Sequence, residues 1–544
     1  MSRASSPLSW IVGLPPIKRA VNRAIRTAAR VSRSSRSSQA RAAQAGQLAR
    51  LLTRARATKF GRDHRFDRIL READASPDRF VDAFQRSVPL RSYEQLWDDY
   101  LAGPYPTLRD VTWPGLIPYF ALTSGTTQGT TKYIPVSREM LASNRAAAWS
   151  MVRSFMASRP DSRIFEGKIF FLGGSTDLET PAPGIRQGDL SAIASLEVSE
   201  VLRPYTFPPV DLAHETDWDR KLSTLVDRSR SEPITLISGV PSWLLMFFER
   251  LLERSGAQRV AEVWPTLEVV VHGGVKFDPY RPAFDRILGS DRIALQETYP
   301  CSEGFIAYGD QATGLLRLLE RNGLFFEFVP VDELDRPNPS RHWVGNAQVG
   351  VNYAIVLSTC AGMWAHLVGD TVRFESLDPP LLSFTGRTKY TLSAFGEHLI
   401  SEEIEAAMAV AAGQSGASVQ EWHAGPVFEG ALGHHHFLVE FSTPPTSLDA
   451  FRSALDADLS RRNADYAAHR VEGVGLPIPA LCSVRPGAFT DWMRSRGKLG
   501  GQHKVPRMDG SGQLTAELAG FFRDAGAVLD DRRAGGASSP SGTA

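Results

Sequence analysis

Three short apolar runs, each followed closely by glycine, constrain the fold of this chain more than any other feature. They are Lys168–Leu172, Ile234–Ile237 and Leu267–Val271, and a glycine follows each of them within two residues. Helical patterns come after the second and third runs, at Trp243–Leu252 and Tyr280–Leu288. A repeated strand, glycine turn and helix predicts an α/β fold, in which ligands bind where the strands end.

The pattern of apolar segments changes near residue 324, and the new pattern continues to residue 388. Its apolar segments are strand-like and have no long helix between them, which predicts a small antiparallel sheet or barrel. We therefore expect a large N-terminal α/β domain over 47–388 with a β-rich subdomain over 324–388. A smaller C-terminal α+β domain follows over 389–532, and the Gly/Ser/Pro-rich tail 533–544 is expected to be disordered.

The length and composition are those of an ordinary globular protein. The chain has 544 residues, of which 42% are hydrophobic and 22% charged, and its net charge of +1 gives no reason to expect a nucleic-acid partner. Cys301, Cys360 and Cys482 lie far apart, so neither a disulfide framework nor a zinc spacing follows, and we expect a reducing, cytoplasmic location. No apolar run approaches the roughly 20 residues of a membrane-spanning helix.

The near-zero net charge hides a basic N-terminal arm over residues 1–46. Residues 1–62 contain fourteen Lys or Arg and no Asp or Glu. Val21 and Ile25 recur at helical spacing among arginines, which makes a short basic amphipathic segment. We expect the arm to be poorly ordered; weak contact with an anionic surface and an organelle transit peptide are the alternatives.

A loop rich in hydroxyl groups occupies Thr123–Lys132. Its first residues are Thr123, Ser124, Gly125, Thr126 and Thr127. Glycine lets a ligand approach the backbone closely, and turned N–H groups with hydroxyls can wrap an anion such as a polyphosphate. The spacing is not that of a Walker loop, and a Ser/Thr/Gly-rich linker explains the loop equally well when it is taken alone.

Two motifs at strand ends provide groups for a nucleotide. Thr298–Glu303 follows a predicted strand; Tyr299 could stack on a base, and Glu303 could hold the hard cation that a triphosphate needs. His366–Asp370 places Asp370 at a strand entry, where a carboxylate can accept hydrogen bonds from a ribose diol. The alternatives are a turn with a solvated glutamate and an ordinary Gly-Asp turn.

Two further motifs lie where the domains join and near the C-terminus. Phe384–Arg387 stands where the domains join, and Thr385–Arg387 within it is predicted to be a turn. Gly500–Arg507 places Lys504 in a glycine-flexed loop, and a mobile lysine suits an α-phosphate because phosphoryl chemistry needs positive charge on developing negative charge. A surface lysine is the alternative.

In this order the motifs resemble those of the adenylate-forming enzymes. They are most similar to the acyl-acid amido synthetases of the auxin-responsive Gretchen Hagen family, and the resemblance covers Gln47–Arg507. The strings that carry it are Thr58–Phe66, Val88–Tyr93, Thr123–Gly129, Thr298–Glu303, Val368–Asp370, Asn463–Tyr466 and Gln502–Arg507.

This resemblance implies an adenylate-forming fold, with a β-barrel-like subdomain and a mobile C-terminal domain that swings about a hinge soon after Arg387. It implies that ATP and a carboxylic acid give an acyl adenylate and pyrophosphate, and that an amine, usually an amino acid, then forms an amide. Catalysis would come from positioning and charge stabilisation rather than from a covalent nucleophile.

The resemblance also implies roles for individual residues. Lys504 would contact the reacting phosphate, Glu303 would hold Mg²⁺, and Asp370 would bind the ribose. ATP would further be held by Thr123, Ser124, Gly125, Thr126, Thr127, Thr298, Tyr299 and Arg387.

The chain departs from the family pattern at two places. His398 stands where plant members carry a lysine, and Pro300-Cys301 replaces smaller residues. His272 and Trp243, at strand-to-helix turns, are expected to be core residues, so nothing defines the acid or amine pocket. The alternatives are an acyl-CoA ligase with coenzyme A as the acceptor and a catalytically inactive scaffold that docks through its basic arm.

Overall fold

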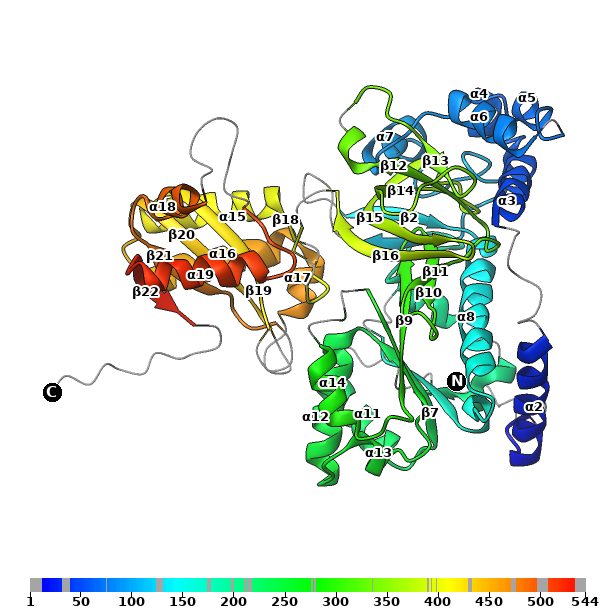
Figure 1. Ribbon diagram of the computed structural model, residues 1–544, viewed down its shortest axis with the longest axis horizontal. Helices are drawn as coiled ribbons and strands as arrows, with labels where there is room; N and C mark the ends of the chain where they lie inside the picture. The colour runs from blue at the N-terminus through cyan, green and yellow to red at the C-terminus, as the bar shows by residue number, and fades with distance from the viewer. Residues whose placement is uncertain are drawn as a thin grey trace. The chain divides into compact units, whose positions relative to one another are not determined.

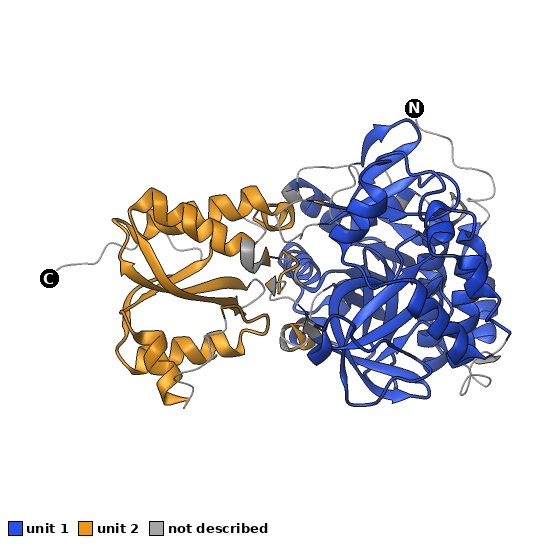
Figure 2. Ribbon diagram, turned by 90° about the horizontal axis from the view of Figure 1, so that it is seen from above, with its two compact units in different colours: residues 1–123, 132–274, 286–388 blue, residues 124–131, 275–285, 389–544 orange. Residues whose placement is uncertain are grey.

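The computed structural model describes two compact units of the chain. Unit 1 comprises residues 1–123, 132–274 and 286–388, and unit 2 comprises residues 124–131, 275–285 and 389–544 (Figure 2). The described residues are 12–533 apart from 32–39, 75, 124–130, 174–177, 197–199, 210–211, 213–217, 275–276, 278–279, 335, 389–390, 393, 398, 429–432, 471–475 and 497–506.

Unit 1 is built around one twelve-stranded sheet (Figure 1). In spatial order its strands are β13 (His342–Trp343), β12 (Leu324–Pro330), β14 (Asn352–Thr359), β15 (His366–Leu377), β16 (Pro380–Arg387), β11 (Leu316–Leu318), β10 (Gly304–Gly309), β9 (Ala294–Cys301), β8 (Val269–Gly273), β7 (Ile234–Gly239), β3 (Lys168–Phe171) and β6 (Thr206–Phe207). The strands from β9 to β6 pair in parallel, and those from β13 to β9 pair antiparallel.

The parallel half confirms the predicted alternation of strands and helices. Strand β7 is followed by α12 (Pro241–Ser255), and β8 is followed by α14 (Arg281–Leu288). The glycine at the end of β8 is required by close packing, because a β-carbon on Gly273 would lie 2.5 Å from the Thr298 carbonyl oxygen on β9. The strand ends can therefore approach one another where ligands are expected.

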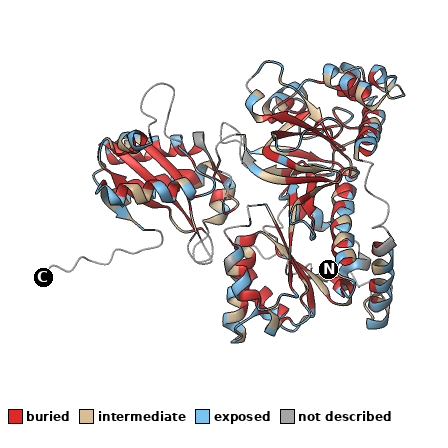
Figure 3. Cartoon of the chain, in the orientation of Figure 1, coloured by how far each residue is buried: buried red, intermediate tan, exposed pale blue. Residues whose placement is uncertain are grey.

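The antiparallel half contains the strands predicted between residues 324 and 388. They continue the same sheet through β11 and β10 into the parallel strands, which the sequence pattern does not indicate. Every residue of β12 is buried, and Figure 3 shows buried residues along the strands of unit 1. Strands buried on both faces read as nearly continuous apolar runs, which is the pattern of Leu324–Val329 apart from Glu327.

A second, four-stranded sheet and the helices complete unit 1. The sheet has the order β2 (Lys132–Val136), β1 (Tyr119–Thr123), β5 (Ile185–Gly188) and β4 (Leu178–Ala182). The long helices are α2 (Pro15–Val31), α3 (Ala40–Ala55), α8 (Arg138–Ser158), α11 (Trp218–Ser229) and α12, and the shorter ones include α6 (Pro77–Ser87), α7 (Tyr93–Leu96) and α9 (Leu190–Leu196). Helix α8 begins where Ser137 caps it, since the Ser137 hydroxyl accepts a hydrogen bond from the Met140 amide.

The expectation of a poorly ordered arm does not hold for Pro15–Val31, which forms helix α2. Lys18 is buried and donates to the carbonyls of Gly167 (3.2 Å) and Pro204 (3.0 Å). Asn22 is buried and donates to the Ser162 carbonyl at 2.9 Å. The amphipathic segment is ordered because its inner face packs on the core beside α8 and satisfies these carbonyls.

Unit 2 has the predicted α+β character. Its sheet has the order β19 (Ser418–Val427), β20 (His434–Thr443), β21 (Ala480–Val484) and β22 (Val528–Arg532). One face packs on α15 (Ser401–Ser415) and α16 (Leu448–Arg462), and the other packs on α18 (Ala488–Ser495) and α19 (Gln513–Asp524). Helix α17 (Ala464–His469) and the ribbon of β17 (Thr391–Leu392) and β18 (Leu399–Ile400) complete it. The predicted disordered tail, beyond Arg533, lies outside the described residues.

Among the described residues, no helix is long and apolar enough to cross a membrane.

Candidate active site

The motif Thr298–Glu303 forms a β-hairpin at the centre of the large sheet. Strand β9 runs to Cys301, further than predicted, and the chain reverses at once into β10, where Gly304 pairs with Cys301. Thr298 and Tyr299 are therefore strand residues rather than loop residues. Glu303 lies at the turn. This register puts the three side chains at fixed places on a rigid element.

Tyr299 on β9 contacts Asp370 on β15. The Tyr299 hydroxyl donates to Asp370 Oδ2 at 2.7 Å, and both side chains are buried. Asp370 lies within β15 rather than at its entry, and opposite Arg387 on β16. The Tyr299 ring packs edge-to-face on Phe384, with 5.6 Å between ring centroids. The structure thus brings together two residues that the sequence assigned to one nucleotide.

Glu303 lies beside His366, which is on the same strand as Asp370. Glu303 Oε1 is 3.5 Å from His366 Nε2, and both side chains are buried. Burial alone would raise the pKa of Glu303. The hydrogen bond and charge of His366, with the charge of Lys132, outweigh it and lower the pKa of Glu303 to about 2. Glu303 is therefore an anion at neutral pH.

Lys132, the last residue of the hydroxyl-rich segment Thr123–Lys132, acts on this site through its charge. Thr123 at the end of β1 pairs with Lys132 at the start of β2, so the backbone brings the two ends of the loop together. Lys132 Nζ lies 3.9 Å from a carboxylate oxygen of Glu94 and 5.1 Å from the ring centroid of Tyr93. Its charge also reaches Glu303, as the lowered pKa of that carboxyl shows.

Thr298 links β9 to β8 beside the hairpin. Its hydroxyl donates to the His272 carbonyl at 2.9 Å, across the β8–β9 pair. His272 is buried, as expected of a core residue, and Trp243 is only partly buried. The side chain of Thr298 therefore has a structural partner in addition to any ligand.

Cys301 lies close enough to Glu303 and Asp370 for the charges of both carboxylates to act on its thiol. Its thiol donates to the Gly304 carbonyl at 3.3 Å. Burial, together with the charges of Glu303 and Asp370, raises the pKa of the Cys301 thiol well above its usual value. A protonated thiol is a poor nucleophile, so this cysteine does not offer covalent catalysis.

Several residues assigned from the sequence lie outside the described residues. These are Ser124, Gly125, Thr126, Thr127, His398 and Lys504. The predicted turn Thr385–Arg387 is the end of strand β16 instead, because Gly386 and Arg387 pair with Thr371 and Asp370. His366 had no role among the expectations from the sequence. The signal that could have found it is its place in the motif His366–Asp370, four residues before Asp370.

Models of three domains of one protein family match the chain. The GH3 family N-terminal domain matches residues 34–222, the central domain residues 317–387, and the C-terminal domain residues 402–512. The three matches together span more than half of the chain, and they occur in the family's N-terminal, central and C-terminal order.

Curated relatives match a shorter part of the chain. An indole-3-acetic acid-amido synthetase, GH3.8, of Oryza sativa subsp. indica is 27% identical over 276 residues, which are 46% of this chain and 44% of the relative. GH3.3, an indole-3-acetic acid-amido synthetase of Arabidopsis thaliana, is 25% identical over 268 residues, with the same coverage. The chain thus spans less than half the length of the relatives it matches.

Solved structures share the fold along nearly the whole chain. The AtGH3.15 acyl acid amido synthetase, in complex with 2,4-DB, aligns with a TM-score of 0.55 and 15% identity over 98% of each chain. A 2-hydroxyisobutyryl-CoA ligase aligns with a TM-score of 0.52 and 17% identity over 88% of this chain and 92% of that one. The fold is therefore that of the adenylate-forming enzymes.

Proposed function

The chain belongs to the GH3 family, and on that premise we propose that it is an ATP-dependent acyl acid amido synthetase. In the first step a carboxylate oxygen of the acid attacks the α-phosphorus of ATP, and pyrophosphate leaves. In the second step an amine, preferably that of an amino acid, attacks the acyl carbonyl; AMP leaves and the amine loses a proton. The products are an amide, AMP and pyrophosphate.

The hydrogen bond between Tyr299 and Asp370 carries this proposal. It joins, at 2.7 Å, the two residues that the family pattern assigns to adenine and ribose. A carboxylate has two oxygens and about four acceptor positions, so Asp370 can hold a ribose hydroxyl while it accepts from Tyr299. The Tyr299 and Phe384 rings supply an aromatic wall against which a purine can pack.

Glu303 fits the Mg²⁺ ion that ATP brings. Mg²⁺ prefers oxygen ligands and commonly binds one or two carboxylates together with phosphates and water. Glu303 offers a buried carboxylate that is ionised at neutral pH because its pKa is about 2. When bound, the ion would supply positive charge to the phosphates. His366 orients the Glu303 carboxylate and keeps it charged.

The remaining assignments are part of the proposal. Thr123, Ser124, Gly125, Thr126 and Thr127 bind phosphate. Thr298, at the end of the β8–β9 pair, contributes to the same site. Lys504 contacts the reacting phosphate. Arg387 binds ATP from the end of β16, where its backbone pairs with Asp370.

A movement of unit 2 separates the two half-reactions in this proposal. The last segment of unit 1 ends at Thr388, one residue after Arg387, and the last segment of unit 2 begins at Lys389. A hinge at this point lets different residues of unit 2 serve adenylation and amide formation.

The cell location that we propose is the cytoplasm. Cys301, Cys360 and Cys482 are free thiols, and Cys360 and Cys482 are buried. Unpaired cysteines suit a reducing compartment.

Acid-dependent exchange of pyrophosphate into ATP tests the first step. The panel of acids begins with indole-3-acetic acid and 2,4-DB, which the names of the relatives suggest, and extends to aliphatic and hydroxy acids. We expect exchange with at least one acid, and AMP release with a new amide once amino acids are added. A folded protein that exchanges pyrophosphate with none of these acids would contradict the proposal.

Two further measurements separate the alternatives. Formation of a thioester with coenzyme A, and of no amide, would identify an acyl-CoA ligase. Absence of ATP binding by calorimetry with Mg²⁺ present would favour a scaffold. Within the proposal, Lys504→Ala is expected to reduce exchange by about 100-fold, because it removes charge from the reacting phosphate.

A further inference from the structure

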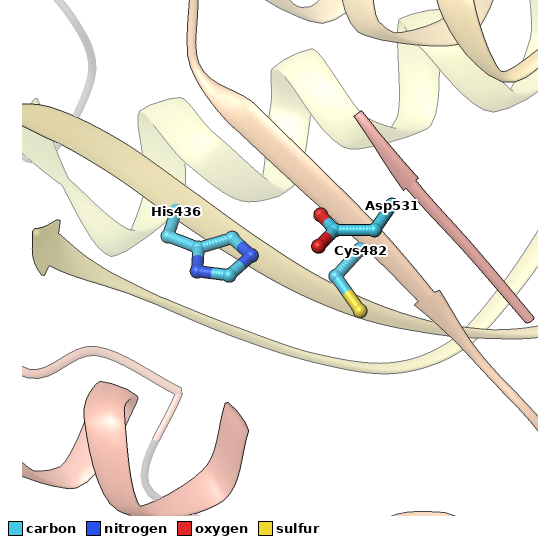
Figure 4. A group of neighbouring side chains, drawn as sticks. All are labelled: His436, Cys482 and Asp531. Atoms are coloured by element: carbon cyan, nitrogen blue, oxygen red, sulfur yellow. The ribbon is translucent and has the colours of Figure 1, made fainter. Parts of the chain in front are cut away.

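Three potential metal ligands converge on the sheet of unit 2, and none of them belongs to the proposed ATP site. They are His436 on β20, Cys482 on β21 and Asp531 on β22, and one donor atom of each lies within 4.8 Å of the other two. Figure 4 shows the imidazole, the thiol and the carboxylate approaching one another from three strands.

The register of the sheet fixes this convergence. Asp531 pairs directly with Cys482, so their side chains share a face. Cys482 pairs with Leu438, and His436 lies two residues before Leu438 on the same face. The three ligands therefore come from three adjacent strands, and no spacing in the sequence reveals them.

The cluster has an unsatisfied donor atom and one ligand open to solvent. His436 Nε2 is buried and has no hydrogen-bond partner among the described residues. Such a group costs free energy unless it gains a partner, and a metal ion is one. Asp531 is exposed and His436 is partly exposed, whereas Cys482 is buried at 4% exposure. An ion can enter from the side of Asp531 and reach the thiol.

We propose that His436, Cys482 and Asp531 bind Zn²⁺, with water as the fourth ligand. Sulfur, imidazole nitrogen and carboxylate oxygen are the ligands that Zn²⁺ accepts in tetrahedral sites, whereas Mg²⁺ and Ca²⁺ prefer oxygen alone. Bond lengths of about 2.0–2.3 Å require donors about 3.5 Å apart, so small side-chain rotations close the site.

The charges of the ligands suit this ion. Burial lowers the pKa of His436 to about 4, so its imidazole is neutral and can donate a lone pair. Burial raises the pKa of Cys482 to about 12, so the metal must displace the thiol proton. A thiolate and a carboxylate then balance the two charges of Zn²⁺.

The ion would stabilise the edge strand β22. Strand β22 lies at the end of the sheet order and, in the part of the chain that the structure describes, pairs only with β21. Edge strands lack a second partner and are held less firmly than central ones. A metal that joins β22 to β21 and β20 stabilises unit 2, and this role does not depend on the proposed enzyme activity.

Spectroscopy of the full chain tests the site with Co²⁺ as the probe. Metal-free protein, prepared with a chelator, is titrated with Co²⁺, and Zn²⁺ is then added as a competitor. We expect one Co²⁺ per chain with a thiolate-to-cobalt charge-transfer band, and loss of the band when Zn²⁺ is added. Co²⁺ bound at Glu303 could give such a band only through the neighbouring Cys301 thiol, and the Cys301→Ala variant distinguishes that case.

Variants assign the ligands. Cys482→Ala is expected to abolish the band, and His436→Gln and Asp531→Asn to weaken binding at least about 10-fold. Asp530→Asn is the matched control because it changes the neighbouring residue, whose side chain points to the other face and pairs with Arg532. Cys301→Ala is the control for the thiol beside Glu303 in unit 1. Both controls should keep the band.

Thermal unfolding gives a second readout. Zn²⁺ should raise the Tm of the wild type and of Asp530→Asn, and Mg²⁺ should not. If Cys482→Ala does not fold, the exposed Asp531→Asn supplies the comparison. The absence of a charge-transfer band in the wild type, a band of full strength in Cys482→Ala, or an equal Tm rise in Asp531→Asn and wild type would overturn the site.

Discussion

Tyr299 donates a hydrogen bond to Asp370 at 2.7 Å, although 71 residues separate them in the chain. The two strands that carry them are not neighbours in the sheet, since β10, β11 and β16 lie between β9 and β15. The contact therefore depends on the curvature of the sheet and on the exact register of each strand. It brings the adenine-side and ribose-side residues of the proposed ATP site into one hydrogen-bonded pair.

Tyr299→Phe tests this pair. The substitution keeps the ring against Phe384 and removes the hydroxyl that orients Asp370. Because hydrogen bonds to charged groups contribute about 1.5–3 kcal/mol, we expect the KM for ATP in the exchange assay to rise about 10-fold or more. Tyr205→Phe is the matched control, since Tyr205 is also buried and donates to the Val12 carbonyl at 3.3 Å, away from the site. An unchanged KM in Tyr299→Phe would show that the pair does not serve ATP.

Glu303→Gln separates charge from shape at the proposed Mg²⁺ position. The amide has the size of the carboxylate but no charge, so pyrophosphate exchange is expected to fall about 100-fold or more. Wild-type exchange should show no acid limb from Glu303 between pH 5 and pH 8, because its pKa is about 2. Near-normal exchange by Glu303→Gln would place the metal elsewhere.

The stability of the same variant depends on pH with a definite sign. The pKa of Glu303 is about 2 in the folded protein, whereas the ordinary value of a glutamate side chain is 4.5. A lowered pKa stabilises the fold above pH 4.5, by about 3 kcal/mol, and the contribution is lost as the pH falls toward 2. The Tm advantage of wild type over Glu303→Gln should therefore shrink between pH 6 and pH 3. A constant difference in Tm would contradict the pairing with His366.

The sequence predicted the parts of the site that local chemistry reveals. Tyr299, Glu303 and Asp370 stand in short strings whose residue types suit a nucleotide, and the structure brings them together. His366 was missed because a buried histidine gains its role from Glu303, which is 63 positions earlier in the chain. Such a pairing depends on tertiary register, which no local pattern contains.

In the fold, too, the features with a local sequence signal were predicted and those that depend on tertiary contacts were not. Glycines after apolar runs predicted β7 and β8 with their helices, because a tight turn leaves its own local signal. The joining of the antiparallel strands to the parallel ones depends on β11, which has only three residues. Helix α2 was expected to be poorly ordered because its arginines dominate the composition, whereas its order comes from Lys18 and Asn22 bonding to distant carbonyls.

Asn22→Ala tests the anchoring of α2. Asn22 donates to the Ser162 carbonyl at 2.9 Å and accepts from the Phe165 amide at 3.3 Å. Its removal leaves both buried groups without this partner, so we expect a loss of about 1–3 kcal/mol of stability, measured as a lower Tm. Arg23→Ala, one residue along on the exposed side of the helix, should change the Tm little. Equal effects of the two substitutions would mean that α2 is not held through Asn22.

Arg341→Met tests a buried ion pair in unit 1. Arg341 Nε and Nη2 each lie 2.9 Å from an oxygen of Glu327, which is fully buried on β12. Because the substitution leaves a buried carboxylate without its cation, we expect destabilisation of about 3–5 kcal/mol. Arg336→Met breaks the exposed pair with Glu333 and should cost at most about 1 kcal/mol. Comparable Tm values for the two variants would contradict this difference.

Cys301→Ala tests whether the reaction passes through a covalent thioester on the protein. Burial and the charges of Glu303 and Asp370 raise the pKa of the thiol, so it is protonated at neutral pH. The acyl adenylate already provides a good leaving group, and the two half-reactions need no protein nucleophile. We therefore expect exchange and amide formation within about threefold of wild type, because a cysteine that is not a nucleophile contributes only packing. Glu303→Gln, measured in the same assay, is the comparison, because it is expected to lose pyrophosphate exchange as a functional residue would. A folded Cys301→Ala protein that adenylates the acid but forms no amide would instead establish acyl transfer through the thiol.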